Sequence, residues 1–146
     1  MTFPTPPYIR PIPLLAGLAL LCVAGCSDSH PERVPISGTV LIDGVPVDRG
    51  SIMFVNGKTR PAMSVIDKEG HFQLTCFQIG DGAVLGKHKV KVTVSEGIDD
   101  HSMRWFAPKK YSDENSSGLE VEVTEPRDDL KIELTWDGGK PFVERW

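Results

Sequence analysis

Three segments of this chain alternate between apolar and polar side chains, and this alternation constrains the fold more than any other feature. They are Lys89–Val94, Leu119–Thr124 and Leu130–Trp136. A period of two is typical of a β-strand with one buried face, because successive side chains of a strand point to opposite faces. Each segment is therefore predicted to be a half-buried antiparallel strand, with its apolar side chains turned toward a shared core.

Four further strands are expected in the first half of the domain, where the pattern is less regular. Turn sequences punctuate this region, namely Asp43-Gly44 and the stretch from Asp67 to Gly70. The expected strands are Ile36–Ile42, Ser51–Val55, Ala62–Ile66 and His71–Cys76, and the last two are expected to form a hairpin. About seven short strands predict an all-β fold, a two-sheet antiparallel sandwich.

The N-terminal region predicts a signal peptide over residues 1–25. Residues 12–24 are apolar apart from Pro13 and Gly17, which suits a signal-peptide core of roughly 7–15 residues and is too short to span a bilayer. The sequence Val23-Ala24-Gly25-Cys26 then resembles the bacterial lipobox, an aliphatic residue and two small residues before a cysteine. The resemblance implies cleavage between Gly25 and Cys26 and transfer of a diacylglyceryl group to the Cys26 sulfur.

An anchor at Cys26 predicts a protein held on a membrane of the cell envelope. Two or three acyl chains anchor stably, whereas one chain is marginal. Residues 26–33 are then the lipidated cysteine and a polar tether, and Ser27 after the cysteine favours the outer membrane by analogy with enterobacterial sorting. Two alternatives stay open: an ordinary cleaved signal with an incidental cysteine, and an uncleaved anchor.

Several turn-and-strand motifs of the expected domain, residues 34–137, occur together in a known family. They are Ser37–Val40 with Asp43–Val47 and Gly50–Val55, then Asp67–Phe72, then Gly86–Val92. Together they resemble the carboxypeptidase regulatory-like domain, a transthyretin-like β-sandwich, and Pro108–Tyr111 with Ser117–Leu119 resemble small lipoproteins of Planctomycetes. The resemblance implies a transthyretin-like or Ig-like sandwich. It implies no carboxypeptidase activity, because the domain is an accessory to the enzyme in that family.

The net charge and the cysteine positions indicate which partners and which cysteine chemistry to expect. The net charge of −4 argues against nucleic acid, whose binding needs Lys and Arg to neutralise phosphates. Of the three cysteines, Cys22 would leave with the signal peptide and Cys26 would carry lipid. Cys76 alternates with Phe72 and Leu74, so we expect its thiol to face the core and to be inert.

No catalytic or metal-binding motif is evident. His30, His71, His88 and His101 show none of the zinc spacings, and the chain has no G-x-S-x-G nucleophile elbow. The acidic stretches around Asp99 and Asp113 do not follow the EF-hand pattern. We therefore expect no enzymatic activity, no cofactor and no metal.

Two regions are candidates for binding. The segment 98–118 is the longest stretch without a strand pattern, and its Trp105, Phe106 and Tyr111 either form a binding loop or pack over one end of the sandwich. The tail 138–146 carries Phe142 and Trp146, which either pack back on the domain or meet a partner.

These observations together favour a lipid-anchored cell-envelope protein. Its non-catalytic sandwich would serve a structural role or bind an envelope protein whose identity the sequence leaves open, as it does the oligomeric state. The alternative is a lipoprotein that binds a small molecule or a carbohydrate through the 98–118 loop.

Overall fold

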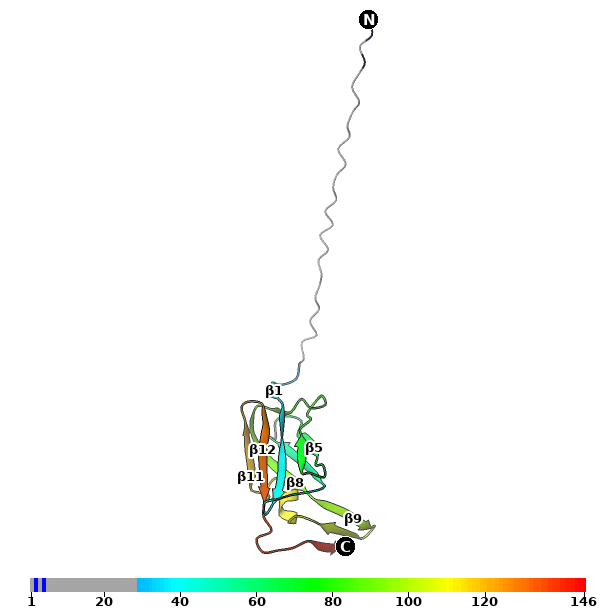
Figure 1. The fold of residues 1–146 in the computed structure, drawn as a ribbon, viewed down its shortest axis with the longest axis vertical. Coiled ribbons are helices and arrows are strands. Elements are labelled where there is room, and N and C mark those ends of the chain that lie inside the picture. Colours follow the sequence, from blue (N-terminus) through cyan, green and yellow to red (C-terminus); the bar gives the residue numbers. More distant parts are fainter. Residues whose placement is uncertain (1, 3, 5–28) are drawn as a thin grey trace.

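The chain folds into an all-β body, shown in Figure 1 by the computed structural model, which describes residues 2, 4 and 29–146. The predicted signal peptide, residues 1–25, falls in the part that is not described, apart from residues 2 and 4. The elements are β1 (Arg33–Val34), β2 (Ile36–Ile42), β3 (Val45–Pro46), β4 (Ser51–Val55), β5 (Ala62–Val65), β6 (His71–Gln73), β7 (Ala83–Val84), β8 (Gly86–Thr93), β9 (Ser95–Asp99), β10 (Ser102–Trp105), the 3-10 helix η1 (Lys109–Ser112), β11 (Leu119–Val123), β12 (Arg127–Leu134) and β13 (Phe142–Arg145).

All seven predicted strands are present, although the expected count of seven is too low. The thirteen strands include six that the pattern did not predict, and these are two to five residues long: β1, β3, β7, β9, β10 and β13. Strands this short carry too few side chains to show a period of two, so their pairing depends on partners elsewhere in the chain.

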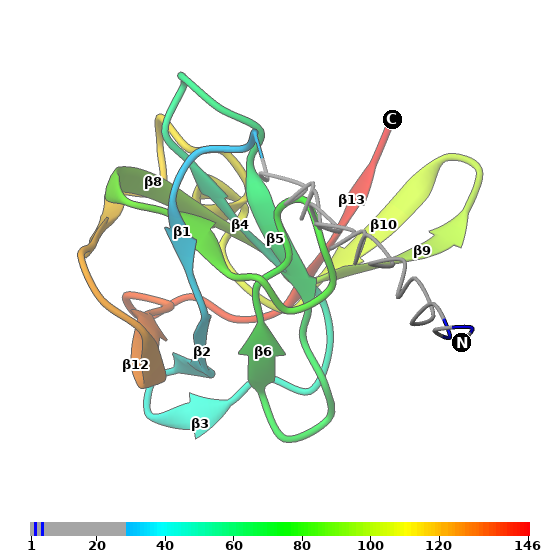
Figure 2. The same cartoon turned by 90° about the horizontal axis from the view of Figure 1, so that it is seen from above.

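Two four-stranded sheets form the two layers of the body. One has the order β11-β8-β4-β5, and the other has the order β12-β2-β3 with β6 also paired to β2. Figure 2 shows β12, β2, β3 and β6 on one side of the body and β8, β4 and β5 on the other. The expectation of a wholly antiparallel fold is wrong at one place, because β12 runs parallel to β2. In the chain, β12 follows β11, which is an edge strand of the opposite sheet. No hairpin joins β12 to β2, so the connection does not force these two strands to be antiparallel.

The alternating side chains meet between these layers. In β8 the side chains of His88, Val90 and Val92 are buried, whereas Lys87 and Lys89 are exposed. The largest fully buried side chains include Phe54 and Leu74, and the core draws on both four-stranded sheets. Each such side chain contributes roughly 1.5–3 kcal/mol on burial, which explains why the period-two segments fix the fold.

The predicted hairpin over residues 62–76 is only partly correct. β5 pairs with β4 and β6 pairs with β2, so the two strands belong to different sheets. The arms of the hairpin are joined by the bridge between Met63 and Thr75 and by the hydrogen bond from the N–H of Gln73 to Oγ of Ser64. Asp67 caps the turn between them, accepting hydrogen bonds from the backbone N–H groups of Glu69 and His71. The turn therefore carries the chain from one layer to the other.

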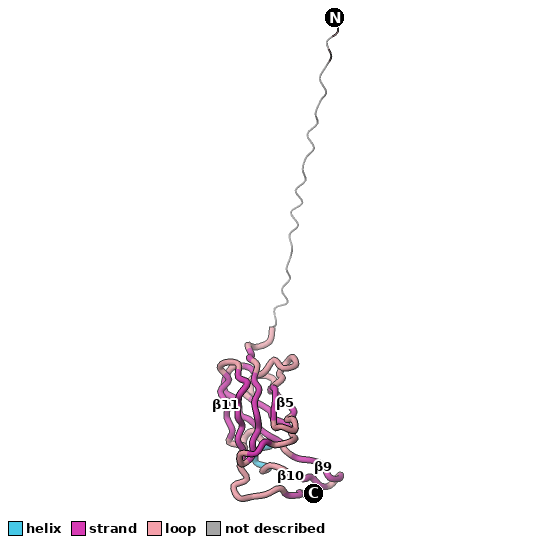
Figure 3. Tube along the Cα trace, viewed as in Figure 1, coloured by secondary structure: helices cyan, strands magenta, loops and turns pink. Residues whose placement is uncertain are grey.

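A third sheet, in the order β13-β10-β9, extends from one end of the body. In Figures 1 and 3 it lies at the end opposite to β1, where the described domain begins. We call these three strands the distal sheet. The segment 98–118 is thus less irregular than expected, since it holds β10 and η1, and the tail 138–146 holds β13.

Candidate functional site

The predicted lipidation and cleavage residues, Gly25 and Cys26, lie outside the described residues, so that assignment stays a prediction. The structure does show how the chain enters the domain next to them. The tether was expected to reach Arg33, but Arg33 already belongs to β1, which pairs with β7 through Arg33–Val84 and Val34–Ala83.

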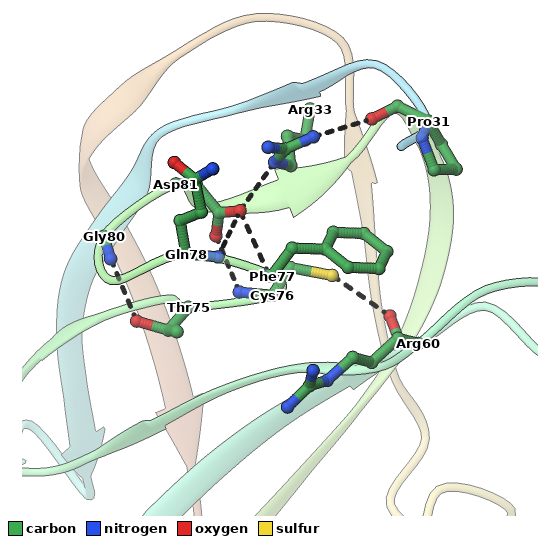
Figure 4. A network of polar contacts seen from close by, with 9 residues as sticks. All are labelled: Pro31, Arg33, Arg60, Thr75, Cys76, Phe77, Gln78, Gly80 and Asp81. Atoms are coloured by element: carbon green, nitrogen blue, oxygen red, sulfur yellow. Dashed lines mark hydrogen bonds and ion pairs between the residues drawn. The ribbon is translucent and has the colours of Figure 1, made fainter. Parts of the chain in front are cut away.

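A carboxylate fixes this entry strand to the body, as Figure 4 shows. Asp81 accepts a hydrogen bond of 2.6 Å from Nε of Arg33. It also accepts hydrogen bonds from the backbone N–H groups of Cys76 at 2.7 Å, Phe77 at 3.0 Å and Gln78 at 2.8 Å. One side chain therefore closes the 76–81 loop and holds β1 against it. We call Arg33, Asp81 and the three N–H groups the entry clamp.

The entry clamp stabilises the ionised form of its carboxyl group. Burial alone would raise the pKa of Asp81, but the hydrogen bonds from the three N–H groups and from Arg33 outweigh it and lower that pKa. Cys76 lies beside the clamp with its thiol donating to the backbone oxygen of Arg60, and burial raises the pKa of this thiol. The thiol is therefore protonated and unreactive at neutral pH, as its inward position in the sequence predicted.

The aromatic residues of the predicted binding loop are packed rather than presented. Trp105 is only 6% exposed, and its indole N–H donates to Oε2 of Glu144 at 2.9 Å. The ring of Phe142 stacks beside it with the centroids 6.4 Å apart. Lys109 bonds to Oε1 of Glu144 at 2.6 Å, and its amine lies 5.7 Å from the centroid of the Trp105 ring. These four side chains join η1 to the distal sheet.

The other two residues of that loop are also engaged. Tyr111 is buried, and its hydroxyl bonds to the backbone of Thr135. Phe106 is half-buried beneath the guanidinium of Arg49, which lies 4.5 Å from the ring centroid. The structure thus agrees with the packing alternative for Trp105, Phe106 and Tyr111, and these residues do not form an exposed aromatic platform.

Exposed apolar side chains are instead found along β13 and just beyond it. Phe142, Val143 and Trp146 are 40%, 42% and 65% exposed. Exposed apolar groups that cluster on one element mark interaction sites more often than isolated ones do. The sequence left two alternatives for Phe142 and Trp146, and Phe142 combines both, packing on Trp105 while still reaching solvent.

A cleft of about 410 Å³ lies beside β8 and β11. Its lining includes Lys87, Lys89, Glu114, Asn115 and Glu120 but no Trp, Tyr or Phe. Lys89 donates to the side-chain oxygen of Asn115 at 2.9 Å, within the cleft. The register places Glu120 opposite Lys89 and Glu122 opposite Lys87, so opposite charges are neighbours on this face.

The candidate metal ligands do not come together. Among residues 29–146 there is no group of three or more His, Cys, Asp or Glu side chains placed to hold a metal ion. Asp99 accepts a hydrogen bond from the backbone of His101 at the β9–β10 turn, whereas Asp113 bonds to the N–H of Asn115. His88 is buried, with Nε2 bonded to the carbonyl of Val84 at 2.7 Å.

Sequence reasoning missed both the entry clamp and β13. The clamp joins residues 48 positions apart, and no local pattern marks Asp81 as different from other loop aspartates.

No helix of the described chain is long and apolar enough to cross a bilayer. No protein-family model, no curated protein and no solved structure matches the chain.

Proposed function

We propose that this chain is a lipid-anchored protein of the cell envelope, whose non-catalytic β-sandwich presents its distal sheet to a protein partner. The observation that carries the proposal is the arrangement of its two ends. β1, the first strand after the predicted anchor and its short tether, lies at one end of the body, and the distal sheet lies at the other (Figure 1). An anchor at Cys26 would therefore point the distal sheet away from the bilayer.

The entry clamp supports the tethered role. Any pull on the predicted anchor enters the domain at β1, which has only two ladder pairs of its own. The hydrogen bond from Arg33 to Asp81 links that strand to the 76–81 loop, which adds a charge-assisted contact where the load arrives.

The fold details favour the transthyretin-like class for the domain. Asp43 and Gly44 both have positive φ, 49° and 81°, the conformation of the tight turn that the Asp-Gly sequence predicted within the resembling motif. Two four-stranded layers around one core, with Asp67–Gly70 turning from one layer to the other, also suit such a sandwich.

A protein partner is favoured over a small molecule by the surface that remains accessible. Trp105 and Tyr111 are buried, so they cannot stack on a sugar, whereas β13 offers an exposed strand with apolar side chains. Exposed sheet edges recognise extended polypeptide by adding a strand. A second candidate function is the binding of a small polar ligand in the cleft around Lys89 and Asn115. The volume of this cleft lies in the range of ligand pockets.

The anchor is tested by fractionating cells that express the full chain or its Cys26→Ala variant. We expect the wild type in the membrane pellet after a carbonate wash and Cys26→Ala in the soluble fraction. Cys22→Ala is the matched control, because it removes a thiol from the same apolar run, and it should stay in the pellet. Recovery of Cys26→Ala in the washed pellet, or an unmodified sulfur at Cys26 in the mass spectrum of the wild type, would disprove the lipid anchor.

A further inference from the structure

β13 is an edge strand with one side of its backbone open. It pairs with β10 over its whole length, from Ser102–Arg145 to Trp105–Phe142, without a register shift. The order β13-β10-β9 leaves its other side without a strand in the described part of the chain. Three of its four residues are exposed.

The hydrogen-bond pattern shows which backbone groups face the open side. The N–H of Trp146 donates to the carbonyl of His101 at 3.0 Å, so Trp146 directs its backbone toward the β10 side. Backbone groups of successive residues in an antiparallel pair alternate between the two sides of a strand. The backbone N–H and C=O groups of Phe142 and Glu144 therefore face β10, and those of Val143 and Arg145 point outward.

The edges β9 and β11 carry features that discourage pairing, and the edge strand β5 is already bridged to Thr75 through Met63. The outer edge of the distal sheet, β9, has a register shift against β10, and it carries Glu96 and Asp99. β11 carries Glu120 and Glu122, which would face like charges in a second copy. Charges and bulges are the usual protection of edges. β13 instead combines a regular register with Phe142 and Val143, and its one acid and one base cancel.

We propose that two copies of this chain pair through β13, antiparallel, with Val143 opposite Arg145 of the second copy. The outward groups fix this register, because only Val143 and Arg145 can donate and accept across the edge. Val143 of each copy would lie opposite Arg145 of the other, and each of these two pairs exchanges two hydrogen bonds. The contact therefore has about four hydrogen bonds around a two-fold axis. A register that uses the residue before Phe142 loses a donor, since Pro141 has no N–H.

The side chains suit the same register. Opposite residues of an antiparallel pair share a face, so Phe142 would lie beside Trp146 of the second copy and extend the Trp105–Phe142 stack across the axis. Glu144 would face Glu144 of the second copy. Within each copy Lys109 already bonds that carboxylate at 2.6 Å, which offsets the like charge.

The pairing rests on the proposed function, because it needs the membrane anchor to be stable. The protein partner of the distal sheet is then a second copy of this chain. A contact of one short strand per copy is small and therefore weak in free solution. An anchor that confines both copies to a membrane raises their effective concentration and makes such a contact significant. The two ideas fail separately, because fractionation reports the anchor and cross-linking reports the pairing.

The test uses cysteine cross-linking of the full chain in the membranes of expressing cells, with copper phenanthroline as oxidant. Glu144→Cys places its thiol on the proposed axis, where Cα atoms of such a pair lie about 4.5 Å apart, within reach of a disulfide. We expect a covalent dimer of twice the chain mass on a non-reducing gel. Val143→Cys is more exposed but off the axis, so its dimer yield should be several-fold lower. Co-expressed Phe142→Cys and Trp146→Cys chains, with different tags, give a second cross-link that leaves Glu144 in place.

A proline variant then separates pairing from folding. Val143→Pro removes an outward N–H and leaves the bonds to β10 intact, so the Glu144→Cys dimer should disappear while protease resistance is retained. A dimer yield from Glu144→Cys no higher than from Val143→Cys, together with no Phe142–Trp146 cross-link, would overturn the proposal. So would a dimer that persists with Val143→Pro, or a cross-linked product whose mass shows a different protein.

Discussion

Arg33 donates to Asp81 at 2.6 Å across 48 residues of sequence, and both side chains are only 12% exposed. The bond connects the first strand of the described domain to a loop between β6 and β7. Because Asp81 also accepts three backbone hydrogen bonds, its loss would remove the acceptor of four hydrogen bonds.

We therefore expect Asp81→Ala to destabilise the domain by about 2–4 kcal/mol, since some of the freed donors reach water and others stay buried. Urea unfolding of the purified chain, followed by circular dichroism, measures the effect. Asp129→Ala is the control: it removes an ion pair with Arg127 in which the Asp129 side chain is 76% exposed, and such surface pairs contribute little. Equal losses in the two variants would show that the entry clamp has no special weight.

The same carboxylate predicts how stability depends on pH. The folded-state pKa of Asp81 is lowered, so its ionised form is favoured by folding. This contribution is complete above the unfolded pKa of about 3.9 and is lost as the pH falls through the lower, folded-state pKa.

The difference in unfolding free energy between wild type and Asp81→Asn should thus be constant from pH 7 to pH 5 and shrink below about pH 4. Urea titrations at a series of pH values provide the measurement. A difference that grows on acidification would mean that the sign of the pKa shift is wrong.

The sequence predicts the strands that bury one face, but it does not predict the direction in which they pair. The strands β8, β11 and β12 are visible because one face of each is buried, and the period of Val90 and Val92 records that burial directly. The parallel pairing of β12 with β2 is not visible, because a period of two is the same for both directions of a neighbour.

The distal sheet shows the opposite case. β13 pairs with β10 about forty residues away, and β9 contains Gly97 and two acids, which are poor strand formers on their own. Its existence depends on register between distant segments. The candidate site suffers from the same limit: the sequence marks Trp105 and Tyr111 as notable, but only the partners Glu144 and Thr135 show that both are packed.

The close approach of β2 and β12 provides a further prediction, at Gly38. A Cβ atom placed on Gly38 would lie 1.9 Å from the backbone oxygen of Leu130, so even one methyl group must push the strands apart. We expect Gly38→Ala to cost about 3 kcal/mol or more in unfolding free energy. Gly97→Ala is the control, because a Cβ there meets no atom within 4 Å, and its effect should stay within about 0.5 kcal/mol. Comparable stability of the two variants would contradict the contact between Gly38 and Leu130.

The environment of Cys76 predicts the reactivity of the thiol that remains if Cys26 carries lipid. The side chain is 2% exposed, it bonds to the carbonyl of Arg60, and burial raises its pKa. Alkylation needs the thiolate and access to it, and the folded domain withholds both. Iodoacetamide should label native protein at pH 8 at least about a hundredfold more slowly than protein in urea, because reaction requires local opening of the core. Mass spectrometry of timed samples gives both rates. Rapid labelling of Cys76 in the native chain would show that the loop held by Asp81 opens far more easily than its hydrogen bonds imply.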